Sequence, residues 1–375
     1  MKSVIQVLPA LNQGGVERGT IEIATALQQA GIPNCVISSG GKMVPELTKM
    51  GVKHIQMDVA TKNPLKLWLN AKKMAKLFQK ENAAVVHVRS RAPAWSVKWA
   101  SQQTKIPYIA TYHGRYGTKP AIKKLYNRVM VQGKKVIAVS NFIKEHLMTE
   151  YHVPESKIVV IPRGADVHLF DPAQVTPDKV QAFLNEHNIP LDKPIISLVG
   201  RLTRMKGQSV LLEAMKKMKH QEITVLFIGG NPKGNYEKEL QAEFAKLPAE
   251  TTVKIFAMPG KDMPVVYAAS DIFVQPSLIP ESFGRSIAEA GAMKRVVVAA
   301  AHGGACELIK DGKTGFLTPV GDAKALANAL DKVLDMTTKE RTQIGEAAYV
   351  NVHKNYTIQN MCEKTLALYQ TFLKK

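Results

Sequence analysis

Short apolar runs alternate along the chain with longer segments whose apolar residues recur every three or four positions. In the first half, the runs expected to form strands occupy residues 3–9, 35–40, 83–88, 108–114, 135–140 and 158–164. The segments between them, among them 15–31, 63–82 and 140–151, have the spacing of amphipathic helices. Alternating strands and helices predict a parallel sheet that is covered on both faces.

The same pattern restarts in the second half of the chain. Strands are expected at residues 194–201, 223–230, 253–258, 271–276, 295–301 and 315–319, again with helices between them. A polar segment with several prolines, 170–194, separates the two sets and contains one predicted helix. We therefore predict an α/β fold with two doubly wound, Rossmann-like domains at 1–172 and 194–355, joined by a linker at 173–193.

The composition is that of an ordinary globular protein, with 45% hydrophobic and 22% charged residues in a chain of 375. No apolar run approaches the roughly 18 residues that a membrane-spanning helix needs. The apolar N-terminal run contains Pro9 and lacks a small-residue cleavage site, so we interpret it as a strand rather than a signal peptide. The cysteines, Cys35, Cys306 and Cys362, are scattered, which argues against a disulfide framework or a zinc site and fits a reducing cytoplasm.

Positive charge is the one unusual feature of the composition. The formal net charge is +20, and residues 1–180 hold 26 Lys and Arg against 11 Asp and Glu. Residues 181–375 are closer to balance, with 25 basic and 20 acidic residues. Such a field attracts nucleic acid, phosphorylated small molecules or an anionic membrane surface, and charge alone leaves all three open.

Two loops at predicted strand ends carry basic or glycine-rich motifs, and ligands of such sheets bind at the carboxyl ends of strands. Gly14 and Gly15 follow the first strand and precede a helix, where glycines let a ligand approach the backbone N–H groups. A simple strand-to-helix turn explains them equally well, and Arg18 is either part of an anion site or a solvated helix residue. In the second half, Arg201 follows a strand and Lys206 precedes the next helix, a natural pair for a pyrophosphate.

The stretch "PESFGRSIAEAGAM" at 280–293 places two acids, Glu281 and Glu289, in a small and apolar surrounding. Residues eight apart on a helix lie about 80° apart in rotation and about 12 Å apart along the axis, so these acids could hold two ends of an extended ligand. Ser282 is a candidate helix cap, and the N–H groups of Phe283 and Gly284 are expected to meet an anion. Burying Glu289 is costly unless it is paired, and ribose hydroxyls would satisfy it. Otherwise the two acids are a first-turn residue and an exposed helix residue.

The ordered set of motifs, spread over nearly the whole chain, resembles the retaining glycosyltransferases of family 4, which have the GT-B fold. The resemblance is to bacterial glycosyltransferases of the lipopolysaccharide core and of lipids. The matching pieces are the E-x7-E motif Glu281…Glu289, the G-R-L…K-G loop at 200–207, Gly14–Gly15, His113 in "TYHG", "VSNF" at 139–142 and "HGGACELIKDGKTGFLTP" at 302–319. The sequence departs from the family at Arg163 in "IPRGAD", where the family often has Asn.

The resemblance implies how the chain is organised and what each part binds. Two Rossmann-like domains would face each other across a cleft, and a C-terminal helix at 356–375 would pack back on the N-terminal domain. The N-terminal domain would bind the acceptor and the C-terminal domain a nucleoside-diphosphate sugar. The resemblance implies that Glu281 contacts sugar hydroxyls and that Glu289 holds the ribose. Arg201 and Lys206 would bind the diphosphate, together with the amides of Gly14 and Gly15. The amides of Ser282, Phe283 and Gly284 would lie beside the sugar, and Ala257 and Met258 would meet the nucleobase.

The implied reaction is hexosyl transfer from a nucleoside-diphosphate sugar, most often UDP-linked, to an acceptor hydroxyl with retention at the anomeric carbon. Negative charge grows on the leaving phosphate, where Arg201, Lys206 and helix N-termini would stabilise it. Glu281 and His113 complete the expected catalytic set, with His113 beside the reacting sugar for proton or hydroxyl contacts. No D-x-D motif suited to Mg²⁺ is present, so the reaction is expected to be metal-independent and to need no cofactor.

The basic N-terminal half supplies the candidate acceptor and membrane contacts. Segments 62–80 and 119–135 interleave lysines with apolar residues, as basic amphipathic helices on an anionic membrane do. Core-packing helices with solvated lysines explain the same spacing. The protein is expected in the cytoplasm, with peripheral attachment to the inner face of the cytoplasmic membrane left open. Four arginines are assigned to an acidic lipid or glycan acceptor: Arg18, Arg89, Arg91 and Arg115.

Other interpretations compete with the transferase. A nucleotide-sugar 2-epimerase would keep the fold but need acid and base carboxylates around the sugar and no acceptor. A phosphorylase would need a cofactor-binding lysine, to which no motif points. A non-enzymatic protein that binds nucleic acid would interleave aromatic residues with its basic patches, but aromatics make up only 6% and do not cluster in that way, so no nucleic-acid partner is expected. The sequence leaves the sugar, the base, the acceptor, the linkage and the oligomeric state open.

Overall fold

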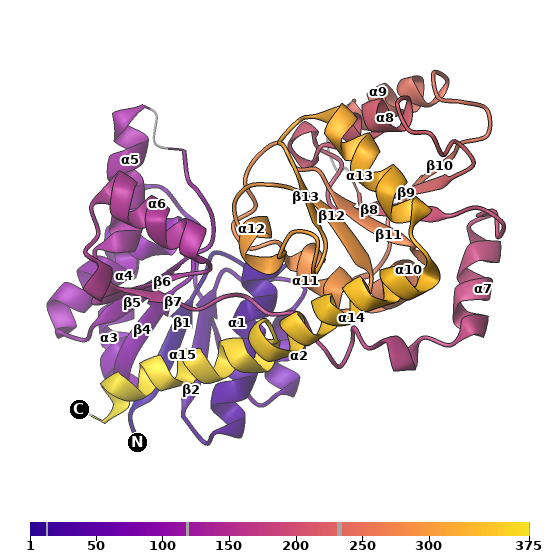
Figure 1. Ribbon diagram of the computed structural model, residues 1–375. Coiled ribbons are helices and arrows are strands. Elements are labelled where there is room, and N and C mark those ends of the chain that lie inside the picture. The colour runs from indigo at the N-terminus through magenta and orange to yellow at the C-terminus, as the bar shows by residue number, and fades with distance from the viewer. Residues whose placement is uncertain (13, 118–119, 231–234, 375) are drawn as a thin grey trace. The chain divides into compact units, whose positions relative to one another are not determined.

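The chain divides into two compact units, each built on one parallel sheet (Figure 1). The N-terminal unit comprises Met1–Arg163 and Ile358–Lys375, and the C-terminal unit comprises Gly164–Thr357. The predicted pair of doubly wound, Rossmann-like α/β domains is confirmed. The computed structural model describes residues 1–12, 14–117, 120–230 and 235–374.

The sheet of the N-terminal unit has the strand order β3-β2-β1-β4-β5-β6-β7, with parallel pairing throughout. Its central strands are buried at every position, which explains why they read as continuous apolar runs rather than as alternating patterns. The edge strand β3 is half exposed and has no such run, so the sequence pattern missed it. The strands are β1 Ser3–Val7, β2 Asn34–Ser38, β3 Lys53–Gln56, β4 Ala83–Val88, β5 Tyr108–Tyr112, β6 Lys135–Ala138 and β7 Ile158–Val160.

Helices of the N-terminal unit include the last helix of the chain, α15, which lies against α1 and β4 (Figure 1). Its Tyr369 is fully buried, and the Tyr369 hydroxyl lies 2.5 Å from Nδ1 of His87 on β4. The helices are α1 Gly15–Gln29, α2 Val44–Lys49, α3 Pro64–Lys80, α4 Arg91–Thr104, α5 Ala121–Asn127, α6 Asn141–Tyr151 and α15 Ile358–Leu373, with short 3-10 turns η1 Arg128–Val131 and η2 Glu155–Lys157.

The sheet of the C-terminal unit has the order β10-β9-β8-β11-β12-β13, again with parallel pairing throughout. The order reverses direction between β8 and β11, so the loops that follow these two neighbouring strands lie at one edge. The strands are β8 Ile195–Val199, β9 Thr224–Ile228, β10 Thr252–Phe256, β11 Ile272–Gln275, β12 Val296–Ala300 and β13 Phe316–Thr318.

Helices of the C-terminal unit cover its sheet and include part of the segment that the sequence analysis treats as a linker. That part is α7, which packs on α10. The long helix α14 begins with a capping box formed by Thr337 and Glu340. The helices are α7 Pro177–Glu186, α8 Gln208–Met215, α9 Tyr236–Phe244, α10 Met263–Ala269, α11 Arg285–Ala292, α12 Ala305–Leu308, α13 Ala323–Asp335 and α14 Thr338–Asn355, with 3-10 turns η3 Pro172–Gln174, η4 Arg204–Lys206 and η5 Gly260–Asp262.

Parallel pairing gathers the loops after neighbouring strands at one edge of each sheet. In the N-terminal unit, the central strands β1, β4 and β5 lead to the Gly14–Gly15 loop, to Arg89 and to His113. In the C-terminal unit, β8, β11 and β12 lead to the loops that contain Lys206, Glu281 and residues 302–304. Within the described residues, no helix is long and apolar enough to cross a membrane.

Candidate functional site

A lysine–glutamate ion pair lies at the carboxyl ends of β8 and β11. Lys206, between β8 and α8, places its ammonium 2.7 Å from Oε1 of Glu281, between β11 and α11. The next residue, Gly207, has a φ of +76°, and a Cβ there would lie 1.9 Å from the carbonyl oxygen of Pro276. Only glycine permits this approach, so the Lys206–Gly207 pair in the sequence is what brings the ammonium to the acid.

Two buried polar side chains hold the carboxylate of Glu281 in place. Ser277 donates its hydroxyl to Oε1 at 2.9 Å, and Gln275 donates its amide to the same oxygen at 3.4 Å. Both donors are 1% exposed, whereas the side chains of Lys206 and Glu281 keep 21% and 25% of their surface exposed. The ion pair is therefore fixed in position and accessible to a ligand. Neither donor was predicted from the sequence, although polar residues at the end of a buried strand and just after it are a usable signal.

The loop at 302–304 packs against the Glu281 segment. The N–H of Gly304 donates to the carbonyl oxygen of Glu281 at 2.7 Å, and a Cβ at Gly303 would lie 2.4 Å from that same oxygen. Nε2 of His302 is buried and has no hydrogen-bond partner among the described residues. Burial also lowers the pKa of His302 below its ordinary value. His302 thus adds a neutral ring with an unsatisfied nitrogen to the site, a residue that the sequence analysis quoted within a motif but did not assign.

Helix α11 begins three residues later than the predicted cap at Ser282. Its N-cap is Gly284, which has a φ of +99°, and no side chain caps the helix. Ser282 as the cap is therefore wrong. The reason is the close approach of the 302–304 loop, since a Cβ at Gly304 would lie 2.2 Å from the carbonyl oxygen of Phe283. That contact holds the segment before Gly284 in a non-helical form, with Phe283 buried.

Glu289 is paired within its own unit. Its carboxylate accepts a hydrogen bond from the hydroxyl of Tyr267 at 3.0 Å and another from Nε of Arg285 at 3.0 Å. Its side chain is 13% exposed. Burial, and then the negative charge of Glu289, raise the pKa of Tyr267 well above its ordinary value. The hydrogen bonds from Tyr267 and Arg285 offset the free-energy cost of burying a carboxylate on an apolar helix, and they hold Glu289 in one orientation.

The remaining predicted donor residues surround the β8 and β10 strand ends. Arg201 is exposed, and its carbonyl oxygen accepts a hydrogen bond from Gln208 at 3.1 Å. Ala257 and Met258 line a cavity of about 560 Å³ beside α7. At that cavity, the ring of His187 stacks on Phe256 with centroids 4.1 Å apart and an interplanar angle of 7°. The cavity offers a flat ligand the aromatic rings of Phe183 and His187, within a lining that is otherwise partly apolar and partly charged.

In the N-terminal unit, Arg163 lies over the glycine loop. One terminal nitrogen of its guanidinium donates to the carbonyl oxygen of Gly15 in the first turn of α1. A Cβ at Gly19 would lie 2.8 Å from that nitrogen, so the small residue gives the guanidinium its place. The N-cap of α1 is Gly14, and no side-chain hydrogen bond caps the start of the helix. A helix N-terminus and a guanidinium thus share one location, which favours an anion there.

Arg163 also contacts His113. Its other terminal nitrogen lies 3.4 Å from Nδ1 of His113, and because a guanidinium can only donate, Nδ1 accepts and Nε2 carries the proton. Nε2 is buried and has no partner among the described residues. Burial, followed by the charges of Arg163 and Arg89, lowers the pKa of His113 well below its ordinary value. His113 is thus a neutral ring with an unsatisfied N–H donor.

The four arginines assigned to the acceptor occupy different environments. Arg89 is 4% exposed, and its Nε donates to Gln6 at 3.0 Å, so the structure places this guanidinium inside the unit rather than on an open surface. Arg18 forms an ion pair with Glu46. The half-buried Arg91 and the exposed Arg115 lie beside aromatic rings, 4.0 Å from the centroid of Tyr116 and 5.8 Å from that of Phe142 respectively.

The structure brings some predicted residues together and leaves others separate. Lys206 meets Glu281, and His113 and Gly15 share Arg163, whereas Arg89 is buried. Among the residues that the structure describes, no cluster of three or more His, Cys, Asp or Glu side chains is arranged to hold a metal ion.

The predicted basic segments contain both buried and exposed apolar side chains. Helix α3 buries Leu67, Met74 and Phe78 yet exposes Leu65 and Trp68 near its start. Helix α5 exposes two large apolar residues, Ile122 at 72% and Leu125 at 61%. Lys119, the first residue of the predicted segment 119–135, lies outside the described residues.

Comparisons with known proteins agree with a fold of two parallel-sheet units. Residues 13–169 match the model of Glycosyltransferase Family 4, and residues 180–351 match that of Glycosyl transferases group 1. A crystal structure of a glycosyltransferase from Rickettsia africae ESF-5 is 40% identical, covers 100% of this chain and 99% of its own, and superposes with a TM-score of 0.93.

More distant relatives extend the similarity. The capsular polysaccharide biosynthesis glycosyltransferase CapM of Staphylococcus aureus is 27% identical over 371 residues, which span 96% of this chain and 94% of CapM. Anabaena HepE, crystallised with UDP-glucose, shares the fold at 21% identity and a TM-score of 0.85, with coverage of 99% of this chain and 100% of its own.

The two parallel-sheet units, together with these matches, identify a glycosyltransferase of the GT-B fold. The chain belongs to glycosyltransferase family 4. It is an enzyme of the hexosyltransferase type, as the sequence resemblance predicts.

Proposed function

We propose that this enzyme transfers a hexose from a UDP-sugar to a hydroxyl of an acidic lipid or cell-envelope glycan, with retention at the anomeric carbon. The observation that carries the proposal is the fixed and accessible Lys206–Glu281 pair at adjoining strand ends. An ammonium suits a diphosphate, and a carboxylate accepts hydrogen bonds from sugar hydroxyls, so the pair matches both halves of a nucleotide sugar. The work would take place in the cytoplasm, where nucleotide sugars are the donors.

The first step of the mechanism is stabilisation of the leaving diphosphate. Lys206 pairs with Oε1 of Glu281, and on donor binding its ammonium would be shared with a β-phosphate oxygen while the carboxylate of Glu281, held by Ser277 and Gln275, accepts hydrogen bonds from the sugar hydroxyls. The exposed guanidinium of Arg201 and the uncapped N-terminus of α11 add positive potential beside it. These groups supply the charge that a metal ion would otherwise provide, so we propose metal-independent catalysis.

The bond changes balance without a cofactor. The bond between the anomeric carbon and the β-phosphate oxygen breaks, and the acceptor oxygen bonds to the anomeric carbon on the same face. The acceptor proton passes to the departing phosphate oxygen, which leaves UDP and a glycoside of unchanged configuration.

His113 has the properties of a donor to a hydroxyl rather than of a general base. Its Nδ1 accepts from Arg163, and its protonated Nε2 lacks a partner within the protein. A neutral ring in this tautomer can donate from Nε2 to a sugar oxygen, but it cannot act as a base there, because Nε2 already carries its proton and the basic nitrogen, Nδ1, faces Arg163. We assign His113 to orienting the reacting sugar.

The cavity beside α7 is the proposed place of the nucleobase. Ala257 and Met258 line it together with His187, whose ring stacks on Phe256 and is held flat by it. The tyrosine-supported carboxylate of Glu289 remains assigned to the ribose hydroxyls. A uracil is favoured over a purine by analogy with HepE, whose fold this chain shares and which was crystallised with UDP-glucose.

The acceptor is proposed to be anionic because the N-terminal unit presents cations near its strand ends. Arg91 and Arg115 lie on half-buried and exposed positions after β4 and β5, and Arg18 follows one turn into α1. Burial of Arg89 removes it from direct contact and leaves it as a support for Gln6 and the glycine segment. CapM, a relative across nearly the whole chain, acts in capsular polysaccharide synthesis, which is consistent with a cell-envelope acceptor.

Donor binding tests the proposal directly. UDP-, GDP- and ADP-hexoses would be titrated into the protein in the presence of EDTA, and hydrolysis of each donor would be followed. We expect one UDP-hexose to bind, and Lys206→Ala to weaken it at least about 100-fold, since a charge-assisted contact to phosphate is lost.

A matched control is Lys216→Ala, which removes a lysine of the same unit that pairs with Glu213 at 2.6 Å and Glu243 at 3.0 Å on the surface. It should leave donor affinity within about twofold. If folded protein binds no nucleotide sugar, or if both variants lose the same affinity, the donor site is not where we place it. Conversion of the donor to its 2-epimer without an acceptor would replace the transferase with the epimerase.

A further inference from the structure

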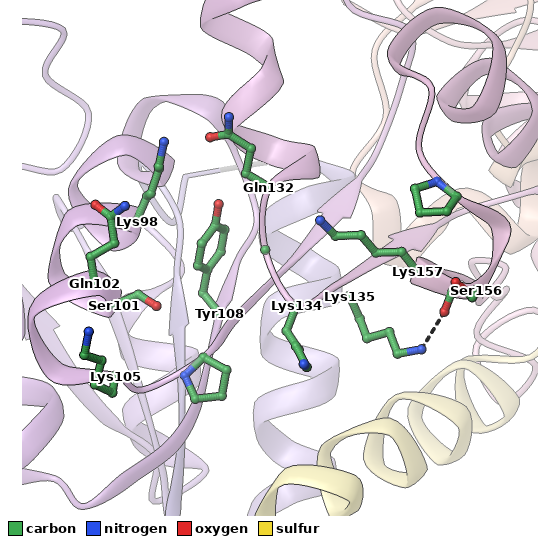
Figure 2. A pocket seen from close by; sticks show the side chains of 13 residues that line it. Lys98, Ser101, Gln102, Lys105, Tyr108, Gln132, Lys134, Lys135, Ser156 and Lys157 are labelled. Carbon is green, nitrogen blue, oxygen red and sulfur yellow. Dashed lines mark hydrogen bonds between the residues drawn. The ribbon is translucent and has the colours of Figure 1, made fainter.

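A pocket on the N-terminal unit is ringed by lysines (Figure 2). The cavity has a volume of about 980 Å³, within the range in which proteins hold metabolite-sized ligands. No acidic side chain is among the residues that line it. Five lysines line this lysine pocket: Lys98, Lys105, Lys134, Lys135 and Lys157.

The lysine pocket lies at the amino ends of the strands of its unit, whereas His113 and the Gly14–Gly15 loop follow the carboxyl ends of strands in the same unit. It is built where α4 ends and where β5, β6 and β7 begin, at Tyr108, Lys135 and the turn before Ile158. His113 follows the opposite end of β5, about 17 Å from the pocket at the rise of an extended strand. The pocket is therefore a location separate from the strand-end loops described above.

In the part of the chain that the structure describes, the lysines of this pocket lack the acidic partners that other lysines of the unit have. Elsewhere in the unit, Lys53 pairs with Glu81 at 2.6 Å and Lys144 with Glu155 at 2.5 Å. Across the described residues, none of the five pocket lysines takes part in a salt bridge. Lys135 donates only to the carbonyl oxygen of Ser156, at 2.7 Å. Burial, and then the charge of Lys134, lower the pKa of Lys157, so these two ammonium groups lie close enough to repel each other.

The floor and rim of the lysine pocket suit a polar ligand. Gly133 forms part of the floor, where a Cβ would lie 2.6 Å from the carbonyl oxygen of Tyr108. Because Gly133 has no side chain, its backbone can pack against Tyr108 and leave the pocket open. Gln102, Gln132 and Ser156 line the pocket with exposed neutral side chains that can donate hydrogen bonds (Figure 2). Charged ammonium donors and neutral side-chain donors therefore line the same pocket, and no carboxylate is among its lining residues.

We propose that the lysine pocket is a second binding site, separate from the donor site, for a ligand that carries two or more phosphate groups. Several ammonium groups around one cavity match a polyvalent phosphate better than a single carboxylate, because each lysine binds phosphate as a point charge. Lipid headgroups of an anionic membrane and soluble polyphosphorylated metabolites share this chemistry. The inference rests on the pocket alone and stands whether or not UDP-sugars are the donors.

The experiment uses the full-length chain with its donor site saturated by UDP. Sodium tripolyphosphate is titrated by calorimetry into the wild type, Lys134→Glu/Lys157→Glu, and the control Lys2→Glu/Lys49→Glu, in which two exposed lysines of the same unit change by the same charge. We expect the pocket variant to bind at least about tenfold more weakly and the control to match the wild type within twofold. Lys134→Gln/Lys157→Gln provides a milder test should the charge reversal disturb folding.

A vesicle arm distinguishes the two sources of phosphate. Flotation with phosphatidylcholine vesicles that contain phosphatidylinositol 4,5-bisphosphate, a lipid with several phosphate groups, is compared with flotation with phosphatidylcholine alone for the same variants. Loss of flotation in the pocket variants alone assigns the site to lipid headgroups, and loss of tripolyphosphate binding alone assigns it to a soluble ligand. Either result supports the site. Equal behaviour of pocket and control variants with both probes, or binding of neither probe by the wild type, overturns it.

Discussion

The two glutamates of the E-x7-E motif differ in what their carboxylates touch. Glu281 is bonded on one oxygen by Lys206, Ser277 and Gln275 and keeps a quarter of its side chain exposed. Glu289 is more deeply buried, at 13%, and is held by Tyr267 and Arg285. The first acid is therefore positioned to exchange a partner for a ligand, whereas the second also supports its own helix.

Replacing Glu281 by Gln tests that difference. Glu281→Gln keeps the shape but removes the charge that positions Lys206, so we expect kcat to fall about 100- to 1,000-fold with a smaller change in KM for the donor. Glu213→Gln, which weakens an exposed contact to Lys216, is the matched control and should retain activity. Steady-state kinetics with the donor identified above measure both. Equal kcat in the two variants would show that Glu281 does not act on the transition state.

Arg163 is predicted to set the protonation of His113. Because its charge is the largest influence after burial, Arg163→Gln should raise the pKa of His113 toward the ordinary value of 6.5 without reaching it. NMR titration of the ring carbons reports this pKa. Arg115→Gln is the control, since the charge of Arg115 acts on His146 instead. An unchanged His113 titration in Arg163→Gln would remove Arg163 from its role.

Candidate site residues could be predicted from the sequence where they belong to a motif. They could not be predicted where only a contact between distant segments of the folded chain brings them to the site. Glu281, Lys206 and His113 follow from order and spacing. Arg163 contacts His113 from 50 positions away, and nothing in the sequence around either residue announces that contact. Arg89 reads as a surface cation after a strand, but the side-chain oxygen of Gln6 and the carbonyl oxygen of Gly19 accept its hydrogen bonds inside the unit.

Strands were predictable where their residues form an apolar run, as the half-buried β7 and β10 also do. The strands that are buried on both faces stand out as apolar runs, but β3 at the sheet edge alternates Lys53, His54, Ile55 and Gln56 and gives no such run. The start of α11 was misplaced because a loop from elsewhere in the chain holds Phe283 out of the helix. The helix propensity of the residues around Phe283 does not reveal a contact with a loop about 20 positions away in the chain.

At the scale of elements, the docking of α15 depends on a buried histidine. His87 on β4 bridges Tyr369 on α15 and the hydroxyl of Thr111 on β5, at 2.5 and 2.6 Å. Burial, followed by the charges of Arg89 and His113, lowers the pKa of His87 well below 6.5. The unfolded chain therefore binds a proton more readily than the folded one, and stability falls as pH drops below about 6.5. The slope is about 1.4 kcal/mol per pH unit for each such histidine.

Urea unfolding between pH 5 and 8 measures this effect. His87→Gln should flatten the acid limb of the stability curve while lowering stability at pH 8, where the buried hydrogen bonds are lost. His152→Asn, at an exposed helix end with a φ of +53° that asparagine tolerates, should leave the limb as in the wild type. An acid limb of the same slope in both variants would assign the pH dependence to other groups.

At the scale of the whole molecule, charge and exposed apolar residues coincide in the N-terminal half. Residues 1–180 carry most of the net charge of +20. Within them, α5 presents Ile122 and Leu125 on the surface, beside Lys123, Lys124 and Arg128. Exposed large apolar side chains among cations are the composition of a helix that inserts shallowly into an anionic leaflet. We propose that this helix contributes to membrane attachment, in a place other than the lysine pocket.

Ile122→Ser/Leu125→Ser is expected to reduce flotation with phosphatidylglycerol vesicles about tenfold, because two side chains that would enter the acyl boundary become polar. Leu191→Ser/Val350→Ser removes two residues of similar exposure, 60% and 59%, from the C-terminal unit and should float like the wild type. Raising the salt to 0.5 M should release the wild type further, because the lysines near α5 are screened. The apolar contribution remains under those conditions, so a residual difference between the two variants at high salt separates insertion from charge. If both double variants float equally at low and high salt, attachment through α5 is wrong.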